Sequence, residues 1–314
     1  MNDAIHVDVE IVGMTHDGQG VASLDGERLF VPGALPGERA RIALQRRRRR
    51  YREAELVEIV EPAPERVDPP CAYYGRCGGC ALQHLSYAAQ VAFKEQVVRD
   101  ALERIAGIEV ADWLPPLTGP EWHYRRRARL GVRYVDAKDR VLVGFKERAS
   151  RFVTDMSSCL VLVEPTHRLP GLLAEAIDTT TLRRQLPQVE IAVGDDARAI
   201  VIRVLAEPTA SDLSTFETLG RAHDVDVYLQ RGGPGTIRLL GSGPARTLSY
   251  QLAAFDTEIA FAPTDFVQVN GVVNAAMVGS VIGRLELGRG DRVLDLYCGL
   301  GNFSLPMARM AAFV

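Results

Sequence analysis

The chain of 314 residues has the composition of a folded globular protein, with 47% hydrophobic residues, 25% charged residues and a formal net charge of −3. No uninterrupted apolar run reaches about 18 residues, so we expect no membrane span, and the acidic, strand-like N-terminus does not resemble a secretory signal. Five cysteines in so long a chain argue against a disulfide scaffold and for a reducing compartment. We therefore expect a cytoplasmic, monomeric protein of roughly two or three domains.

Residues 1–62 are predicted to form a small closed β-barrel of the OB type. The predicted strands either alternate between polar and apolar residues or are continuously apolar, and glycine-containing turns separate them. They cover residues 5–12, 20–24, 28–31, 40–44 and 51–60. Five short strands in one compact segment suit a barrel that binds single-stranded nucleic acid. Residues 46–50 are consecutive arginines in the hairpin before the last strand, and the candidate RNA contacts there are Arg46, Arg47 and Arg48.

A cluster of cysteines follows a proline-rich linker at residues 61–70. Cys71, Cys77 and Cys80 form a glycine-rich C-x5-C-x2-C pattern, in which tight turns can bring three thiolates to one point. A closed metal site needs a fourth ligand, and Cys159 is the only other cysteine outside a later glycine turn. Four thiolates suit zinc and iron–sulfur centres alike, so the spacing leaves both open.

The second domain, residues 63–263, is predicted to be α+β with a mostly antiparallel sheet. A helix over residues 86–106 is expected to begin at Ser86 and end at Gly107. The apolar stripe of this helix is predicted to consist of Val91, Val98, Leu102 and Ile105. A further helix is expected near residues 211–223, and the predicted strands cover residues 128–135, 140–145, 189–193, 197–205, 225–230, 236–240 and 248–261.

A strongly basic stretch lies between Trp122 and Arg151. It holds ten Lys and Arg residues against three acidic ones, a local excess of seven positive charges in a chain whose net charge is negative. The stretch is strand-like, so basic side chains on one face could contact a phosphate backbone, although a solvated face explains the same pattern. Together with the arginine run it favours RNA or DNA as the partner, and the candidate RNA contacts in it are Arg125, Arg126, Arg127 and Arg129.

From residue 264 onward the pattern changes to that of a doubly wound α/β domain. The predicted elements are a helix over 269–287, a short buried strand over 292–296, a glycine turn over 297–301 and a helix over 302–309. Gly299 and Gly301 would let the backbone approach a ligand at the carboxyl end of the strand, beside a helix N-terminus, and Asp295 would orient the turn or the ligand. Residue 304 is serine rather than glycine, so the dinucleotide fingerprint is incomplete and NAD or FAD is the weaker alternative.

The motifs of this sequence occur together, and in this order, in one family. They are the glycine-rich segments 13–20 and 30–38, Cys71…Cys77-Gly-Gly-Cys80-Ala-Leu-Gln-His84, the lone Cys159, Phe266-Val-Gln-Val-Asn270, and Leu294-Asp-Leu-Tyr-Cys-Gly-Leu-Gly-Asn-Phe303. The combination resembles RNA uracil-C5 methyltransferases that carry a TRAM domain and a [4Fe–4S] cluster, in particular those acting on 23S ribosomal RNA. The resemblance covers essentially the whole chain, and the combination is far more specific than any single motif.

The resemblance implies S-adenosylmethionine-dependent methylation of a specific uracil at C5, through a covalent adduct between a cysteine and C6 of the base. It implies that the ligands of the [4Fe–4S] cluster are Cys71, Cys77, Cys80 and Cys159. It also implies that S-adenosylmethionine is contacted by Gln268, Tyr297 and Asn302, with Gly299 and Gly301 in the same turn. The helix over residues 86–106 is implied to pack on the methyltransferase domain.

The sequence departs from the family at its end, because few residues follow the start of the third domain at residue 264. A doubly wound sheet needs more strand–helix units, and the family's nucleophilic cysteine and general base are expected beyond Val314. We therefore expect the third domain, residues 264–314, to be incomplete and the chain to be inactive as it stands. Cys298 is expected to be a packed turn residue rather than the nucleophile. Two alternatives stay open: a uracil-C5 methyltransferase acting on transfer RNA or another ribosomal uracil, and a non-catalytic RNA-binding module with zinc.

Overall fold

The computed structural model describes residues 5–47 and 51–314. Within this description the chain forms two compact units, Met1–Pro116 and Leu117–Val314, each with its own hydrophobic clusters. One compact unit can contain more than one domain, so this division leaves the three predicted domain boundaries untested. None of the described helices is both long and apolar enough to cross a bilayer.

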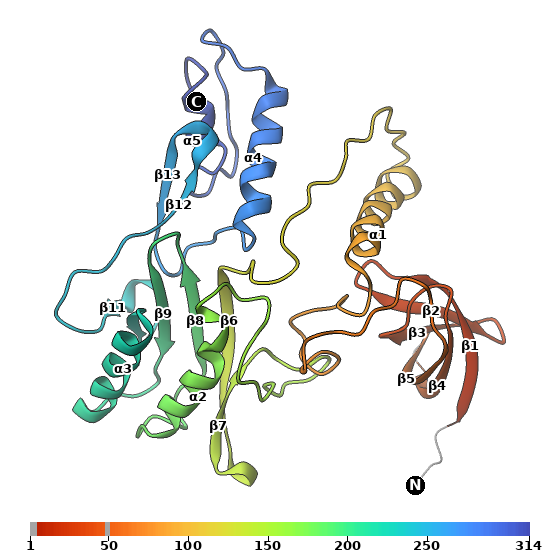
Figure 1. Ribbon diagram of the computed structural model, residues 1–314, viewed down its shortest axis with the longest axis horizontal. Helices are drawn as coiled ribbons and strands as arrows, with labels where there is room; N and C mark the ends of the chain where they lie inside the picture. The colour runs from red at the N-terminus through yellow and green to blue at the C-terminus, as the bar shows by residue number, and fades with distance from the viewer. Residues whose placement is uncertain (1–4, 48–50) are drawn as a thin grey trace. The chain divides into compact units, whose positions relative to one another are not determined.

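The first unit begins with the predicted barrel, which the structure confirms. Its strands are β1 (His6–Met14), β2 (Gln19–Leu24), β3 (Glu27–Pro32), β4 (Arg39–Arg47) and β5 (Arg52–Glu61), closed in the order β1-β2-β3-β5-β4 (Figure 1). Strand β3 pairs with β5 in parallel, and the other pairs are antiparallel. Alternate residues point inward, as a period of two predicts, and Ile11, Leu29 and Ile42 are fully buried in the barrel core.

A helix follows the linker in the same unit, close to the predicted bounds. Helix α1 (Tyr87–Asp100) continues into a short π-helix, η1 (Ala101–Ile105), and the left-handed Gly107, at φ 66°, lies just past its end. Ser86 occupies the N-cap position but its side chain accepts no capping bond, so the expected hydroxyl cap is wrong. The carbonyl of Ser86 accepts the first hydrogen bond of the helix, from the backbone N–H of Gln90 (2.8 Å).

The predicted apolar stripe of this helix is also wrong as a buried face. No residue of α1 is buried, Val98 is 49% exposed and Ile105 is 84% exposed. Ala89 and Phe93, four residues apart and therefore on one face, make the packing contact instead. Their partners in the cluster are Leu35, Ala63 and Leu85. The helix therefore packs on the barrel and linker through a smaller face than its periodicity predicts.

The second unit is built on the predicted, mostly antiparallel sheet. Its strands are β6 (Arg127–Val135), β7 (Arg140–Gly144), β8 (Gln188–Val193), β9 (Arg198–Arg203), β10 (Asp226–Gln230) and β11 (Ile237–Leu239), in the order β11-β10-β9-β8-β6-β7. Only β9 and β10 pair in parallel, because α3 (Ala210–His223) connects them. Helix α2 (Leu169–Asp178), which is not among the predicted elements, packs beside α3 against the sheet (Figure 1).

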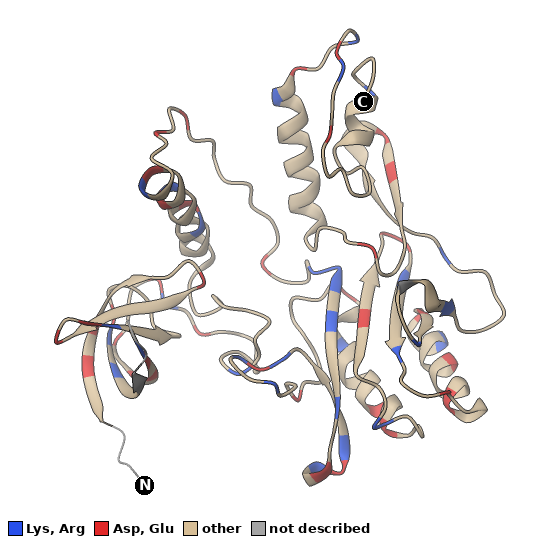
Figure 2. Ribbon diagram, turned by 180° about the vertical axis from the view of Figure 1, so that it is seen from behind, with Lys and Arg blue, Asp and Glu red and all other residues tan. Residues whose placement is uncertain are grey.

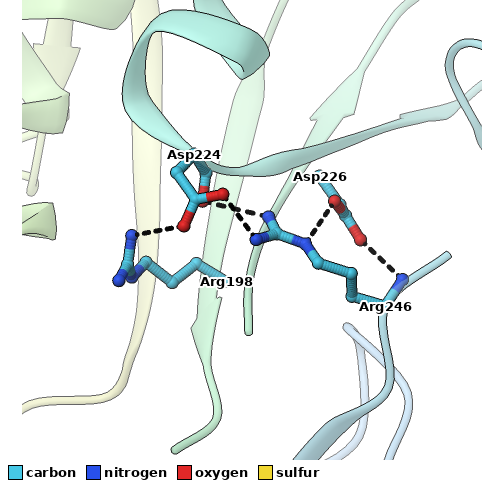
Figure 3. Close-up of polar contacts among 4 residues, drawn as sticks. All are labelled: Arg198, Asp224, Asp226 and Arg246. Carbon is cyan, nitrogen blue, oxygen red and sulfur yellow. Dashed lines mark hydrogen bonds and ion pairs between the residues drawn. The ribbon is translucent and has the colours of Figure 1, made fainter. Parts of the chain in front are cut away.

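An ion-pair network fixes the chain that leaves this sheet (Figure 3). Arg246 lies just before strand β12 and donates to Asp224 at the end of α3 (2.6 Å) and to Asp226 at the start of β10 (2.9 Å). Arg198 of β9 also donates to Asp224 (3.0 Å), and the backbone N–H of Arg246 donates to Asp226 (2.9 Å). The network therefore ties the start of the next hairpin to the beginnings of strands β9 and β10.

That hairpin corrects the prediction of one long strand over residues 248–261. Strands β12 (Leu248–Leu252) and β13 (Thr257–Phe261) pair antiparallel, because a 3-10 turn at Ala253–Phe255 and the left-handed Asp256 (φ 44°) reverse the chain. The hairpin packs with α4 (Gly271–Leu285) and α5 (Ser304–Ala308). Their shared core contains Leu252, Ile259, Val278, Ile282 and Met307.

The expected buried strand over residues 292–296 is wrong. Leu294 is 80% exposed and Leu296 is 69% exposed, and the backbone makes only one parallel bridge in the described chain, between Arg292 and Phe313. A parallel strand is stable when both edges are paired and both faces are covered, and neither condition holds here. The glycine turn and the short helix α5 that follow do form.

Candidate functional site

A cavity of about 590 Å³ lies at the glycine turn of the second unit. Its walls come from the segment 265–268, the turn 295–303 and the hairpin residue Tyr250. Of the predicted cofactor contacts, it brings together Gln268, Tyr297, Gly299 and Asn302. A cavity of this size accommodates a nucleoside-sized ligand.

The turn owes its shape to three left-handed residues. Gly299 (φ 57°) and Gly301 (φ 88°) adopt this conformation without cost, whereas Tyr297 (φ 62°) bears local strain and is fully exposed. Gly301 lies outside the lining of the cavity and supports the turn, since its N–H donates to the carbonyl of Cys298 (3.0 Å). Cys298 itself is exposed, so the expectation that it is packed in the turn is wrong.

The carboxylate of Asp295 orients this turn. It accepts a hydrogen bond from the hydroxyl of Ser304 (2.6 Å), the first residue of α5. Ser304 is the position at which the sequence departs from the dinucleotide fingerprint, and its hydroxyl has a role that glycine cannot fill. The contact joins the two ends of the turn that forms one wall of the cavity.

The opposite wall, around Gln268, is held by two arginines from the start of β6. The backbone N–H of Arg126 donates to the carbonyl of Val269 (2.9 Å), and the guanidinium of Arg127 donates to the carbonyl of Pro263. The side chain of Asn270 then caps α4 by accepting from the N–H of Val273 (3.1 Å). The segment carrying Gln268 is therefore fixed at both ends.

Arg126 and Arg127 are among the predicted RNA contacts, and both have ion-pair partners within the second unit. Arg126 pairs with Asp195, and Arg127 pairs with Glu190 (3.2 Å) with 15% of its side chain exposed. Burial lowers the pKa of Arg127, against the opposing attraction of Glu190. Arg127 and Arg129 of β6 thus share Glu190 of the neighbouring strand β8 as a partner, and Figure 2 shows basic positions on one strand beside an acidic position on the next.

Arg129 remains accessible among the four predicted contacts of this stretch. It also pairs with Glu190 (3.1 Å), but 70% of its side chain is exposed. Arg125 is half-buried and forms isolated backbone bridges to Leu162 and Asn270. Of the predicted contacts in the barrel, the side chains of Arg46 and Arg47 and the whole of Arg48 lie outside the described residues. Contact of any of these residues with RNA stays a prediction.

The cysteine loop lies in the first unit and is tightly turned. The N–H of Cys77 donates to the carbonyl of Tyr73 (2.8 Å), and the N–H of Gly79 donates to the sulfur of Cys77 (3.4 Å). Backbone donors of this kind stabilise thiolates, so the loop suits a soft metal centre in its chemistry. None of the chain's cysteines forms a disulfide; Cys77 and Cys159 are buried, and Cys71 and Cys80 are partly exposed.

The described residues do not assemble a metal site. No group of three or more His, Cys, Asp or Glu side chains among them is placed to hold an ion. Cys159 belongs to the second compact unit, while the other three predicted ligands belong to the first. Thiolate sites form together with their metal, because the metal offsets the repulsion between the ligands. The four-cysteine cluster therefore stays a prediction.

Comparisons with known proteins assign the class to which this barrel and cavity belong. A TRAM domain model matches residues 4–57, and the model of the tRNA (Uracil-5-)-methyltransferase family matches residues 86–314. The chain belongs to this family of RNA uracil-C5 methyltransferases and carries an N-terminal TRAM domain.

Its relatives carry a more particular name. A protein of Nitrosococcus oceani named 23S rRNA (uracil(1939)-C(5))-methyltransferase RlmD is 45% identical over 97% of this chain and 68% of its own length. A protein of the same name from Methylococcus capsulatus is 44% identical over 97% of this chain and 69% of its own length.

A solved structure resembles the fold. The tRNA (uracil-54, C5)-methyltransferase of Pyrococcus abyssi, in complex with S-adenosyl-L-homocysteine, matches with a TM-score of 0.67 and 23% identity. The match covers 94% of this chain and 69% of that one. At this identity it shows that the two proteins share a fold.

Proposed function

We propose that the chain belongs to an enzyme that transfers a methyl group from S-adenosylmethionine to C5 of a specific uracil in 23S ribosomal RNA. The observation that carries the proposal is the cavity between Gln268 and the turn at Gly299, in a chain whose relatives bear the name of that activity. Two amide side chains, a close-approach glycine and a nearby carboxylate suit a ligand with both adenosine and amino-acid groups.

S-adenosylmethionine supplies an electrophilic methyl group when bound. Gln268 and Asn302 would hold the ligand by hydrogen bonds, and Gly299 would let the backbone approach it without a side chain between them. Tyr297, strained and exposed at the edge of the cavity, would cover the ligand. These roles use only residues that line the cavity.

Uracil C5 is a weak nucleophile, so the reaction class proceeds through a covalent adduct. A cysteine thiolate adds to C6, and the resulting enolate attacks the methyl group from C5 while the sulfonium becomes a neutral thioether. A base then removes the C5 proton and the thiolate leaves. Neither the cysteine nor the base is assigned to a residue of this chain.

Four cysteines are proposed to bind a [4Fe–4S] cluster: Cys71, Cys77, Cys80 and Cys159. Methyl transfer needs no external electron donor or acceptor, so the cluster would serve to position the RNA-binding parts. The barrel and the exposed side chain of Arg129 would contact the RNA backbone. A target uracil must leave its base stack to reach the cavity, which favours a flexible RNA loop as substrate.

Titration calorimetry of the whole chain with S-adenosylmethionine and with S-adenosylhomocysteine tests the cofactor proposal. Gln268→Ala removes a lining amide and should raise Kd about tenfold, the effect of one lost hydrogen bond of about 1.4 kcal/mol. Gln251→Ala is the matched control, because Gln251 is an exposed glutamine of β12 outside the lining. Absence of binding, or equal affinity of the two variants, would overturn the proposal.

The substrate proposal has a separate test. The relative affinities of a 23S ribosomal RNA fragment and of transfer RNA, measured at one salt concentration, distinguish the two candidate substrates. Preference for the ribosomal fragment supports the proposal, and preference for transfer RNA supports the alternative.

A further inference from the structure

Three hydrogen bonds hold the side-chain amide of Asn302 at the wall of the cavity. Its Nδ2 donates to Oδ1 of Asn274 (2.9 Å). Its Oδ1 accepts from Nδ2 of Asn274 (3.0 Å) and from the hydroxyl of Tyr250 (3.0 Å). Asn274 lies in the first turn of α4 and Tyr250 in the middle of β12. A helix and a hairpin therefore converge on one residue of the glycine turn.

Both partners are anchored in the core. Asn274 is 5% exposed, and the other buried residues of its helix are apolar. A buried amide without a hydrogen-bond partner is costly, so the pair with Asn302 stabilises this residue. Tyr250 packs in two hydrophobic clusters, and its ring centroid lies 6.2 Å from that of Phe261. Burial raises the pKa of Tyr250, so its hydroxyl keeps its proton and can donate.

These hydrogen bonds leave the Asn302 amide with one N–H donor for a ligand. A carboxamide offers two N–H donors and an oxygen that accepts two bonds. Both acceptor positions and one donor are used within the described chain, so one Nδ2–H remains on a residue that lines the cavity. The reciprocal pair with Asn274 also opposes a flip of the Asn302 amide alone, because such a flip would set donor against donor and acceptor against acceptor.

We propose that Asn274 and Tyr250 are positioning residues for the methyl donor, fixing the Asn302 amide so that it presents a single N–H donor to an acceptor atom of the bound ligand. Neither residue needs to touch the ligand through the groups that hold Asn302. The proposal rests on the proposed S-adenosylmethionine site, and it adds a helix residue and a hairpin residue to its machinery.

The test is a double-mutant cycle on S-adenosylhomocysteine affinity, measured by titration calorimetry of the whole chain. Tyr250→Phe keeps the ring and removes the hydroxyl, and it should raise Kd about fivefold, since one hydrogen bond contributes about 1 kcal/mol. Asn302→Ala should raise Kd further. In the Asn302→Ala background, Tyr250→Phe should have no additional effect, because the group that it positions is gone.

Tyr228→Phe is the matched control. Tyr228 is buried in the same hydrophobic cluster as Tyr250, burial likewise raises its pKa, and it lies outside the cavity lining. This variant should bind S-adenosylhomocysteine as the wild type does. Asn274→Ala should weaken binding as Tyr250→Phe does; its thermal unfolding midpoint shows whether it folds, and Tyr250→Phe tests the proposal independently.

The outcomes separate the two levels of the proposal. A wild-type chain that does not bind S-adenosylhomocysteine refutes the cofactor site itself. A wild-type chain that binds while Tyr250→Phe binds equally well refutes the positioning role. An equal effect of Tyr250→Phe with and without Asn302 also refutes it, because the hydroxyl of Tyr250 then acts independently of Asn302.

Discussion

Glu38 and Arg66 form an ion pair at the junction of the barrel and the linker. The carboxylate of Glu38 is fully buried and accepts from Nη2 of Arg66 (2.8 Å) and from the N–H groups of Leu35 (2.7 Å) and Ala63 (3.3 Å). Arg66 also donates to the carbonyl of Gly33 (2.7 Å). One carboxylate thus ties the linker to the turn between β3 and β4.

Removing the charge of Glu38 should destabilise the protein strongly. Glu38→Gln keeps the shape but leaves the guanidinium of Arg66 without its counter-charge, and breaking a buried pair in this way costs about 3 kcal/mol. Urea unfolding followed by circular dichroism measures the difference. Glu58→Gln is the control, because its exposed pair with Arg41 (2.9 Å) contributes little. An unchanged unfolding free energy for Glu38→Gln would contradict the assigned role.

The same pair predicts a pH dependence. Burial favours the neutral acid, but the hydrogen bonds from Arg66, Leu35 and Ala63 outweigh it and hold the pKa of Glu38 below its ordinary value. Because its pKa is lower in the folded state, the ionised carboxylate stabilises the fold at every pH above the ordinary pKa of glutamate. This stabilisation is lost as the pH falls through the folded-state pKa. The wild-type advantage over Glu38→Gln should therefore shrink on acidification. An advantage that grows at low pH would show the opposite sign of shift.

The contact between Ser304 and Asp295 should control the order of the glycine turn. Ser304→Ala removes a hydrogen bond to a carboxylate, worth about 1.5 kcal/mol, and should raise the Kd for S-adenosylhomocysteine about tenfold. Ser280→Ala on α4 serves as the control, since Ser280 lies outside the cavity lining. Equal affinities of the two variants would show that the turn is ordered without this bond.

Gly194 marks a close approach between the central sheet and the hairpin. A Cβ at this position would lie 2.7 Å from the carbonyl oxygen of Ser249 and 2.8 Å from its nitrogen, both backbone atoms of β12. Gly194→Ala should lower the unfolding free energy by about 1–3 kcal/mol and weaken ligand binding by displacing the hairpin. Gly279→Ala, in the open middle of α4, should stabilise by up to about 1 kcal/mol. Denaturant unfolding of both variants compares them directly.

The cysteine prediction concerns metal content. Anaerobically purified protein should be brown and contain iron and acid-labile sulfide, and Cys77→Ser or Cys159→Ser should abolish both. Cys298→Ser should retain iron and sulfide, because Cys298 is exposed in the glycine turn at the cavity and is not among the four proposed ligands. Colourless protein with one zinc ion would instead support the RNA-binding module. Iron retained in Cys159→Ser would remove that residue from the ligand set.

The local sequence pattern predicted the strands of the barrel correctly, but it did not predict elements that depend on partners far away in the sequence. Alternating polarity and glycine turns define β1 to β5 within the segment itself. Helix α2 was missed although its buried residues Leu169, Leu173 and Ile177 recur at the helical spacing, because Pro170 and Gly171 in its first turn are typical of a loop. Residues 292–296 have the composition of a buried strand but lack the neighbours that would make them one.

In the candidate site, too, the sequence indicated some of the residues and not others. The motifs around Gln268 and Asn302 were singled out through their resemblance to the family, and the structure brings both residues to one cavity. The sequence could not show that Arg127 pairs with Glu190, because the two residues lie 63 positions apart. Asn274 was missed, although a polar residue on the apolar face of a helix is a signal that sequence alone provides.

A crystal structure of the chain with S-adenosylhomocysteine tests the central claim most directly. We expect the ligand in the cavity between Gln268 and the turn at Gly299, with one acceptor atom within hydrogen-bond distance of Nδ2 of Asn302. A ligand bound elsewhere, or one in the cavity that makes no contact with either amide, would contradict the assignment.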